Sequence, residues 1–307
     1  MTCLVTGASG FIGSALCAHL AAEGVGLVAT SRGGAVTASG IATRPMDPAH
    51  PQARLLEGVD SVVHLAGVAH QHAAPEMYDK VNVEATLALA RAALEAGVRQ
   101  FIYFSSVKAM GPPHHESPRT ETELTLPVDA YGRSKREAEL QLDALCRDGG
   151  MCLVILRPCL VYGPSPRANL RLLAGLARWW PLRPPEGGVR SMIGLQDLVS
   201  LVSLLVRQPP AESRTWLVAD GKPLSAREMY DELRQARGLG PGRQCLPHFL
   251  WRFACRLVDY LRGEVGGSTA HKLFAAEQYD ASAVQGATGW QPRQCFADVA
   301  PAMVEGR

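Results

Sequence analysis

A glycine-rich turn near the amino terminus constrains the fold more than any other feature of this chain. The segment TGASGFIG occupies residues 6–13, directly after the apolar run Thr2–Thr6 and at the start of a helical pattern. In such a turn the first glycine permits a tight bend, the second lets the backbone approach a ligand, and the third lets helix and strand pack closely. The helix then offers N–H groups and its positive dipole end to a phosphate. The segment predicts a pyrophosphate site for a dinucleotide.

Short apolar runs alternate with helical patterns through the first half of the chain. The runs are short enough to be strands buried on both faces: Thr2–Thr6, Val25–Thr30, Ser61–Leu65, Gln100–Ser105 and Cys152–Arg157. The helical patterns cover Ile12–Glu23, Met77–Ala96 and Asp129–Cys146, and the glycines that follow them, Gly24, Gly97 and Gly149, predict left-handed helix ends. This alternation predicts the α/β class, with a Rossmann-type doubly wound parallel sheet.

Proline and glycine become frequent after Pro158, which favours loops over regular strand–helix units. Later patterns predict a strand at Thr215–Ala219 and helices at Leu195–Arg207, Ser225–Arg237 and Phe249–Leu261. We expect a dinucleotide-binding domain over residues 1–163, with later segments near 191–219 interleaved, and a smaller, mainly substrate-binding lobe over residues 164–307.

Composition excludes several classes of partner. A formal net charge of +2 gives no electrostatic reason to expect nucleic acid. No apolar run approaches the ~20 residues of a membrane span, and no signal-peptide pattern opens the chain, so we expect a cytoplasmic protein. The eight cysteines form no CxxC pair, which argues against a metal site and for a reducing compartment.

The stretch 248–262 is amphipathic, with aromatic and aliphatic residues among basic ones. Such a helix either lies on a membrane surface or packs on its own lobe or on a partner subunit. Packing on its own lobe or on a partner subunit is the simpler interpretation.

The end of the second predicted strand bears on cofactor choice. A fold that binds NAD usually places an acidic residue about 20 residues after the glycines, where it binds the ribose hydroxyls. Here the chain reads Thr30-Ser31-Arg32 instead. Arginine suits a 2′-phosphate, with the two hydroxyls assisting, so the sequence favours NADP(H), with NAD(H) as the alternative.

Tyr131 and Lys135 lie four residues apart, on one face of the predicted helix. A free phenol has a pKa of about 10, and a nearby ammonium favours the phenolate. Ser106 follows a predicted strand about 25 residues earlier, where its hydroxyl can bind the same substrate oxygen. Ser106, Tyr131 and Lys135 are therefore the predicted catalytic residues, which transfer a proton to or from a carbonyl oxygen.

Taken in order, these motifs resemble the extended short-chain dehydrogenase/reductase family, in particular its nucleotide-sugar epimerases, dehydratases and reductases. The similar segments are TGASGFIG, VVHLAG (62–67), the helix carrying Asn82, FSSVKAMG, YGRSK, LRPCLVYGP (156–164) and GWQP near the carboxyl end. The resemblance implies these cofactor contacts: Gly7, Ser9, Gly10, Phe11, Ile12, Gly13, Ser31, Arg32, Asp47, Leu65, Ala66, Gly67, Asn82, Ser105, Tyr131, Lys135, Pro158, Leu160 and Val161.

The same resemblance implies a nucleotide-sugar substrate, bound by Val107, Lys108, Asn169 and the phosphate-binding Arg190. It also implies a homodimer through the helices Met77–Ala96 and Asp129–Cys146. We expect NADPH-dependent reduction of a nucleotide-diphosphate 4-keto sugar, a UDP-4-keto-6-deoxy-N-acetylhexosamine, in surface polysaccharide biosynthesis. The alternatives are an NAD-dependent UDP-sugar 4-epimerase and, in another class, a non-catalytic dinucleotide-sensing protein.

Overall fold

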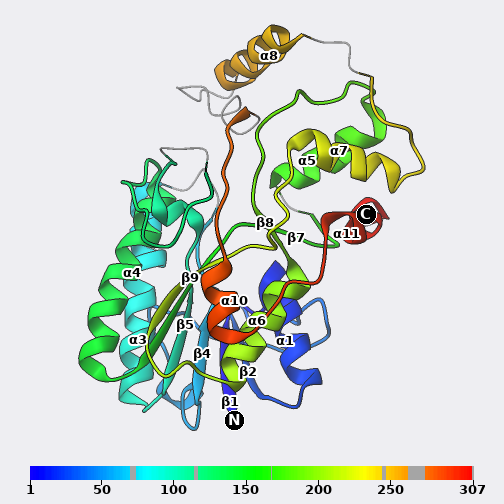
Figure 1. The fold of residues 1–307 in the computed structure, drawn as a ribbon. Coiled ribbons are helices and arrows are strands. Elements are labelled where there is room, and N and C mark those ends of the chain that lie inside the picture. The colour runs from blue at the N-terminus through cyan, green and yellow to red at the C-terminus, as the bar shows by residue number, and fades with distance from the viewer. Residues whose placement is uncertain (70–73, 114–116, 167, 244–246, 262–273, 306–307) are drawn as a thin grey trace.

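The computed structural model describes residues 1–69, 74–113, 117–166, 168–243, 247–261 and 274–305. Within these residues the main sheet has seven parallel strands in the order β3-β2-β1-β4-β5-β6-β9 (Figure 1). They are β1 (Thr2–Thr6), β2 (Gly26–Ser31), β3 (Arg44–Pro45), β4 (Ser61–His64), β5 (Gln100–Phe104), β6 (Cys152–Pro158) and β9 (Arg214–Val218). The predicted doubly wound parallel sheet is confirmed.

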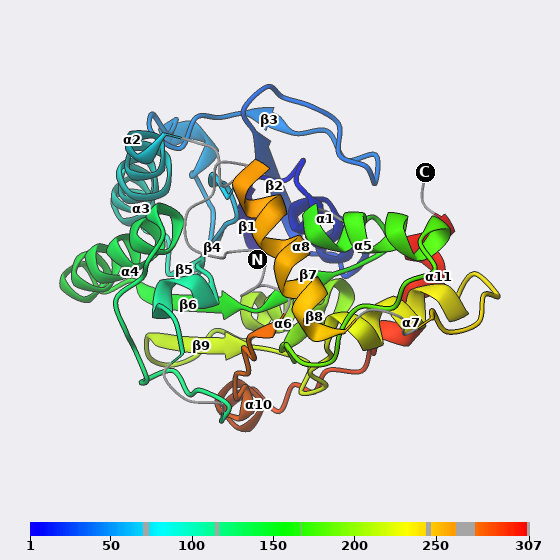
Figure 2. The same ribbon diagram turned by 90° about the horizontal axis from the view of Figure 1, so that it is seen from above.

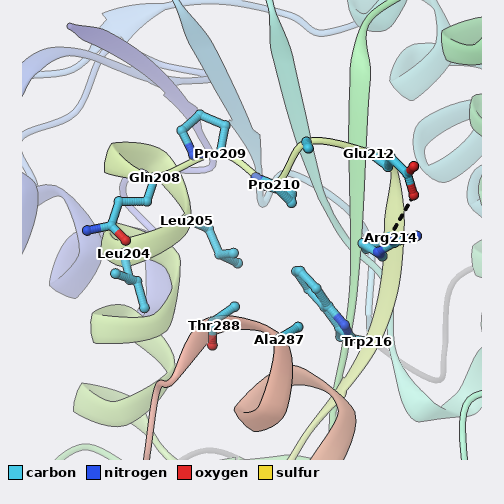
Figure 3. A pocket seen from close by; sticks show the side chains of 11 residues that line it. Leu204, Leu205, Gln208, Pro209, Pro210, Glu212, Arg214, Trp216, Ala287 and Thr288 are labelled. Atoms are coloured by element: carbon cyan, nitrogen blue, oxygen red, sulfur yellow. Dashed lines mark ion pairs between the residues drawn. The ribbon is translucent and has the colours of Figure 1, made fainter.

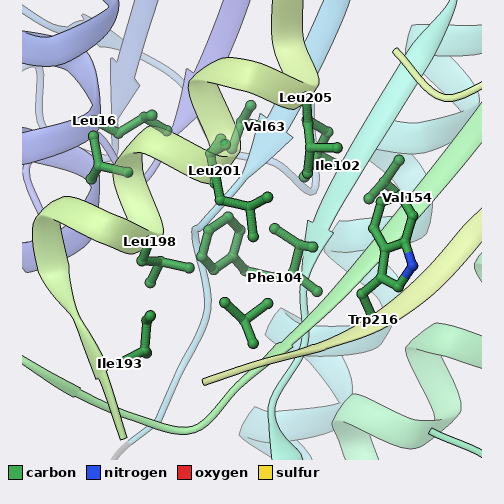
Figure 4. Close-up of a cluster of buried hydrophobic side chains, with 14 of the residues drawn as sticks. Leu16, Val63, Ile102, Phe104, Val154, Ile193, Leu198, Leu201, Leu205 and Trp216 are labelled. Carbon is green, nitrogen blue, oxygen red and sulfur yellow. The ribbon is translucent and has the colours of Figure 1, made fainter. Parts of the chain in front are cut away.

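Helices cover both faces of this sheet (Figure 1). One face carries α1 (Phe11–Ala22) and α6 (Leu195–Arg207), and the other carries α3 (Ala85–Glu95) and α4 (Ala130–Gly149). Figure 4 shows side chains of α1 and α6, among them Leu16 and Leu201, gathered against Val63 and Ile102 of the strands. Because apolar side chains fill both sides, the strands read as continuous apolar runs in the sequence.

Shorter elements connect the strands and helices of the sheet. They are η1 (Ala53–Leu55), α2 (Pro75–Tyr78), the π-helical turn η2 (Asp79–Glu84), η3 (Val107–Met110) and α10 (Ser282–Thr288). The predicted helix Met77–Ala96 is thus divided into α2, η2 and α3.

A smaller lobe lies beyond the carboxyl ends of the strands (Figure 1). It contains the two-stranded parallel sheet of β7 (Leu160–Tyr162) and β8 (Met192–Gly194), together with α5 (Ala168–Trp179), α7 (Ala226–Gln235), α8 (His248–Leu261) and α11 (Phe296–Glu305). Its own core joins α5, α7 and α11 through Leu170, Ala174, Tyr230, Leu233, Phe296 and Met303.

Two details of the helices differ from the sequence-based expectation. The prediction that Gly149 ends α4 is wrong: α4 continues through Gly149, which packs closely on Leu94, and Gly150 closes the helix with φ 71°. Helices α5 and α11 were also not predicted from the sequence. Proline-rich loops flank α5, and Pro301 lies inside α11, where the burial of Phe296, Val299 and Met303 outweighs the low helix propensity of proline.

No helix in the described part of the chain is long and apolar enough to cross a lipid bilayer.

Candidate functional site

The glycine turn lies where the strand order reverses, between β1 and β4, which is where dinucleotides bind in doubly wound sheets. Gly7 has φ 68°, and a Cβ there would stand 2.9 Å from the Ala66 backbone nitrogen. A Cβ on Gly13 would overlap the carbonyl group of Gly7. Helix α1 begins directly after the turn, and Gly10 at its N-cap has no side chain to block access to the helix end. The turn therefore fits a pyrophosphate.

His64 is a residue of this site that the sequence-based prediction missed. Its ring is completely buried at the end of β4, with Nδ1 2.7 Å from Thr6 Oγ1 and Nε2 3.0 Å from Thr86 Oγ1. The Thr86 hydroxyl donates to the Asn82 carbonyl, so it accepts from Nε2–H of the neutral imidazole. Thr6 then donates to Nδ1 and accepts from the Ala66 N–H. A histidine inside an apolar strand was the available signal, because a buried ring nitrogen needs partners.

Asn82 extends this chain of hydrogen bonds toward α4. It lies fully buried in the π-helical turn η2, an irregularity that often marks functional sites. Its amide accepts from the Val68 N–H at 2.8 Å and donates to the Val68 carbonyl and to Ser134 Oγ, both at 3.0 Å. The Ser134 hydroxyl in turn donates to the Tyr131 carbonyl. Asn82 thus fixes the loop after β4 against the helix turn that carries Tyr131, a positioning role within the expected cofactor site.

Burial, assisted by the nearby charge of Lys135, lowers the pKa of His64 to about 3. An unfolded chain binds a proton on this histidine below pH ~6.5, whereas the folded chain does not until about pH 3, so stability falls as the pH falls through that window. When the pH is lowered from 7 to ~4.5, the titration of this histidine is expected to lower the free energy of unfolding by about 3 kcal/mol. Urea unfolding of wild type and His64→Gln measures it: the variant should be less stable at pH 7 and lose less on acidification. Parallel pH profiles would contradict the assignment.

Ser106 and Tyr131 come together as predicted. Ser106 is the N-cap of η3 and accepts from the Lys108 N–H, and the Tyr131 phenol shares a side-chain hydrogen bond with Ser106. Burial raises the pKa of Tyr131 to about 12, and the hydrogen bond with Ser106 acts in the opposite direction. A hydroxyl and a phenol are therefore adjacent at the carboxyl end of β5, where both can reach one substrate oxygen.

Lys135 lies deeper than Tyr131 on α4. Its Nζ donates to the Phe104 carbonyl at 2.8 Å and stands 4.7 Å from the centre of the Tyr103 ring. Burial lowers the pKa of Lys135 to about 8, opposed by the charge of Glu139. Burial dominates the pKa of the Tyr131 phenol and raises it, so the expected lowering by Lys135 together with an oxidised nicotinamide stays a prediction. A Cβ on Gly67 would lie 3.5 Å from Nζ, so the ammonium faces the space beside the loop after β4.

A buried ion pair lies directly behind Lys135. Arg157 Nε and Nη2 donate to the two carboxylate oxygens of Glu139 at 2.9 and 2.7 Å, and both side chains are almost completely buried. The Ser105 hydroxyl donates to the same carboxylate at 2.5 Å. Ser105, predicted as a cofactor contact, thus directs its hydroxyl to Glu139, whereas Ser106 turns toward Tyr131.

At the expected adenosine end of the site, two predicted hydroxyl contacts are already engaged. Thr30 Oγ1 donates to the Val5 carbonyl, and Ser31 Oγ lies 2.6 Å from Thr43 Oγ1. Only Arg32 stays exposed at the end of β2. Asp47 is also exposed. The pKa of its carboxyl is held below the usual range mainly by the hydrogen bond from the Ala49 N–H, with a smaller contribution from the charge of Arg32. A 2′-phosphate would meet the Arg32 guanidinium without help from these hydroxyls.

The predicted substrate residues are not equivalent. Val107 belongs to the apolar core, whereas Lys108 is half exposed with its Nζ 4.0 Å from Asp129. Arg190 is mostly buried, pairs its backbone with Leu224, and holds Nη1 3.8 Å from Glu277 Oε2. The side chain of Asn169 lies outside the described residues.

The segment after β6 shows a similar division among predicted cofactor contacts. Pro158 is buried, Val161 is half-buried and Leu160 is 40% exposed. A Cβ on Gly163 would approach the ring of Phe11 to 2.8 Å, so this segment lies against the glycine turn.

A cavity of about 500 Å³ lies elsewhere, at the amino end of β9 (Figure 3). Trp216, Arg214, Leu204 and Thr288 are among its lining residues. Because all strands of the main sheet run parallel, this cavity is at the edge opposite to Thr6, His64 and Tyr131, and it is separate from the candidate site.

A doubly wound sheet with this glycine turn and a Ser, Tyr and Lys group defines the class of NAD(P)-dependent enzymes. Residues 3–180 match the NAD dependent epimerase/dehydratase family, and the chain belongs to that family. It is 35% identical to the UDP-glucose 4-epimerase of Vibrio cholerae over 254 residues, which cover 79% of this chain and 75% of that protein. The predicted membership of the extended short-chain dehydrogenase/reductase family is confirmed, and the non-catalytic alternative is set aside.

Two further similarities concern a reductase and a solved structure. The chain is 34% identical to the UDP-2-acetamido-2,6-beta-L-arabino-hexul-4-ose reductase of Pseudomonas aeruginosa over 171 residues, or 55% of this chain and 38% of that protein. The fold matches the UDP-glucose-4-epimerase of Stenotrophomonas maltophila, solved with NAD and formylated UDP-arabinopyranose, with a TM-score of 0.81 and 23% identity over 99% of this chain and 97% of that chain. The second similarity supports the fold alone.

Proposed function

We propose that this chain is an NAD-dependent UDP-sugar 4-epimerase, which revises the reductase expected from the sequence. The observation that carries the proposal is the 35% identity to the UDP-glucose 4-epimerase of Vibrio cholerae, which spans most of both chains. The adjacent Ser106 and Tyr131 fit the chemistry, because epimerisation at C4 needs one proton acceptor that later returns the proton.

Each predicted catalytic residue has a distinct task in this proposal. Bound NAD supplies the acceptor, and later the donor, of the hydride at C4. Ser106 holds the C4 oxygen, and Tyr131 takes the hydroxyl proton as the hydride leaves, then returns it to the alkoxide when the hydride comes back to the opposite face of the keto sugar. Lys135 binds the nicotinamide ribose, and its ammonium, with the oxidised nicotinamide, brings the raised phenol pKa down toward the working range.

The smaller lobe would hold the nucleotide diphosphate. Arg190 is the strongest candidate, since its guanidinium is mostly buried and its backbone is fixed to Leu224, which limits the entropy lost on binding a phosphate. Lys108 lies in η3, two residues after Ser106, and its half-exposed ammonium is 4.0 Å from Asp129 Oδ2. Asn169 and the homodimer through the helices Met77–Ala96 and Asp129–Cys146 stay predictions.

A second candidate is the originally expected NADPH-dependent 4-keto-sugar reductase. The exposed Arg32 and the absence of an acidic residue at the end of β2 favour it, because a 2′-phosphate needs a cationic partner. The 34% identity to a reductase that acts on a UDP-linked hexulose supports the same reading over a shorter span. In this case Tyr131 donates its proton once per turnover. A phenol with a raised pKa is protonated at neutral pH, which is the state that a proton donor needs.

The two candidates differ in whether reductant is consumed. The purified chain, incubated with UDP-galactose or UDP-N-acetylgalactosamine and no added reductant, is expected to form the corresponding C4 epimer, and denaturing it should release NAD. Consumption of one NADPH per UDP-4-keto-6-deoxy-N-acetylhexosamine, without epimer formation, would replace the epimerase by the reductase.

Arg32 is expected to act on NADP(H) alone. The substitution Arg32→Gln should weaken NADP⁺ binding about tenfold, the effect of losing one exposed charge-assisted contact, and leave NAD⁺ binding within about twofold. Isothermal titration with each dinucleotide measures both. Arg54→Gln, a second exposed arginine in the same half of the chain, is the control. Equal losses for the two dinucleotides would mean that Arg32 does not face the 2′ position.

A further inference from the structure

Large apolar side chains that stay exposed are concentrated on two helices of the smaller lobe. Four lie on α5 and the residue after it: Leu172, Leu176, Trp179 and Trp180. Five more lie on α8: Phe249, Leu250, Phe253, Leu257 and Tyr260. Every aromatic ring among the large exposed apolar side chains of the described residues is on these two helices or directly after α5, with Trp179 77% and Tyr260 81% exposed.

The exposed residues of α8 form one continuous stripe. Phe249, Phe253, Leu257 and Tyr260 follow one another at intervals of four, four and three residues, which places them on one face of a helix. Cys255 and Asp259, on the other side, are 4% exposed. The helix is therefore amphipathic with its apolar face outward, the reverse of a helix that covers a core.

Helix α5 repeats this arrangement. Leu172, Leu176 and Trp179 are spaced by four and three residues and are at least half exposed. Leu170, Ala174 and Ala177, on the opposite side, are buried in the core of the lobe. The apolar stripe is thus additional to the face that holds α5 in the fold.

The exposed charges on the two helices are all positive. Helix α5 contains no acidic residue, and the only acid of α8, Asp259, is buried. The exposed charged residues are Arg171, Arg178, Arg252 and Arg256. The guanidinium carbon of Arg178 lies 4.6 Å from the centre of the Trp179 ring, so a positive charge and an exposed apolar ring are adjacent on α5.

Both helices lie at the end of the molecule away from the amino terminus, beyond the carboxyl ends of the strands (Figure 1). Seen from that end, α8 crosses the front of the molecule (Figure 2), and Figure 1 shows that it lies farther from the main sheet than α5 does. Both helices, each with its exposed apolar stripe, therefore belong to the same end of the protein.

We propose that α5 and α8 form a docking face for the surface of a membrane rich in anionic phospholipid. Leu, Phe and Trp side chains enter the boundary between headgroups and acyl chains, while the four arginines bind lipid phosphates. A second copy of the chain fits worse, because a symmetric contact would bring the exposed arginines of the two copies together. Helices of 12 and 14 residues lie in the interface plane without spanning the bilayer.

Vesicle flotation tests this face directly. The wild-type chain should float with phosphatidylcholine vesicles that contain about 30% phosphatidylglycerol, much less with phosphatidylcholine alone, and less at high salt. Two double variants, Phe253→Ser with Leu257→Ser and Arg252→Gln with Arg256→Gln, should each lower the bound fraction about tenfold. Leu126→Ser removes an 88% exposed leucine from a loop outside both helices and should change nothing.

Four results would overturn the proposal. They are no flotation of the wild type, equal flotation with both lipid mixtures, unchanged flotation of either double variant, and loss of flotation in the Leu126→Ser control. Light scattering without vesicles tests the alternative, which is that a second copy of the chain covers this face. Self-association that the Phe253 and Leu257 substitutions abolish, together with no vesicle binding, would assign the face to a second copy. Thermal denaturation of each variant checks that the exposed substitutions leave the fold intact.

Discussion

Replacing Tyr131 with phenylalanine is expected to lower kcat by a factor on the order of 10² or more, the range for lost general acid–base catalysis. The ring stays in place, so its packing and the hydrogen-bonded frame around Asn82 and Ser134 are kept, and NAD affinity should stay within about twofold. Steady-state assay of the C4 interconversion, with cofactor binding measured in parallel, checks both expectations.

Tyr103→Phe is the matched control for this experiment. It removes a buried phenol oxygen that has no hydrogen-bond partner among the described residues, beside Lys135 rather than beside Ser106. Turnover of the control should stay near that of the wild type. Near-normal turnover of Tyr131→Phe would mean that another group carries the proton.

The second large effect concerns the ion pair behind the site. Glu139→Ala leaves the Arg157 guanidinium, 3% exposed, without its carboxylate and removes the acceptor of the Ser105 hydroxyl. Breaking one half of a buried pair costs about 3–5 kcal/mol, so Tm should fall by on the order of 10 °C. Differential scanning calorimetry measures the shift.

Glu137→Ala serves as the comparison, because Glu137 is exposed two residues earlier on α4 and pairs only with Gln141 in the described structure. Its Tm should move little. If Glu139→Ala and Glu137→Ala shift Tm equally, the Glu139–Arg157 pair does not hold β6 to α4 as the geometry indicates.

Features set by local sequence were predictable. Five of the six main-sheet strands up to Pro158 were predicted to within a residue or two, and the two-residue strand β3 was missed. These five strands, the glycine turn and the spacing of Tyr131 and Lys135 depend on neighbours a few residues apart. The glycine turn could be placed between β1 and α1 because a strand pattern precedes it and a helical pattern follows it.

What escaped prediction depends on contacts between distant segments. The partner of His64 on β1 lies 58 positions away, and Arg157 reaches Glu139 across 18 positions, so neither pairing leaves a local pattern. Likewise, the hydroxyl side chains of Thr30 and Ser31 are of a type that can bind phosphate, but they already form hydrogen bonds with Val5 and Thr43. The amphipathic pattern of α8 was visible in the sequence, whereas only the fold shows that its apolar face points outward.

The central claim, that hydride leaves and returns to one carbon within a single site, has a direct isotopic test. UDP-glucose deuterated at C4 is incubated with the chain in ordinary water without added reductant, and the UDP-galactose formed is analysed by mass spectrometry and NMR. A 4-epimerase is expected to retain the deuterium at C4 of the product, since the label is held in the site until it returns. Product that has lost the label, or no product from UDP-glucose or from UDP-N-acetylglucosamine labelled in the same way, would contradict the proposed function.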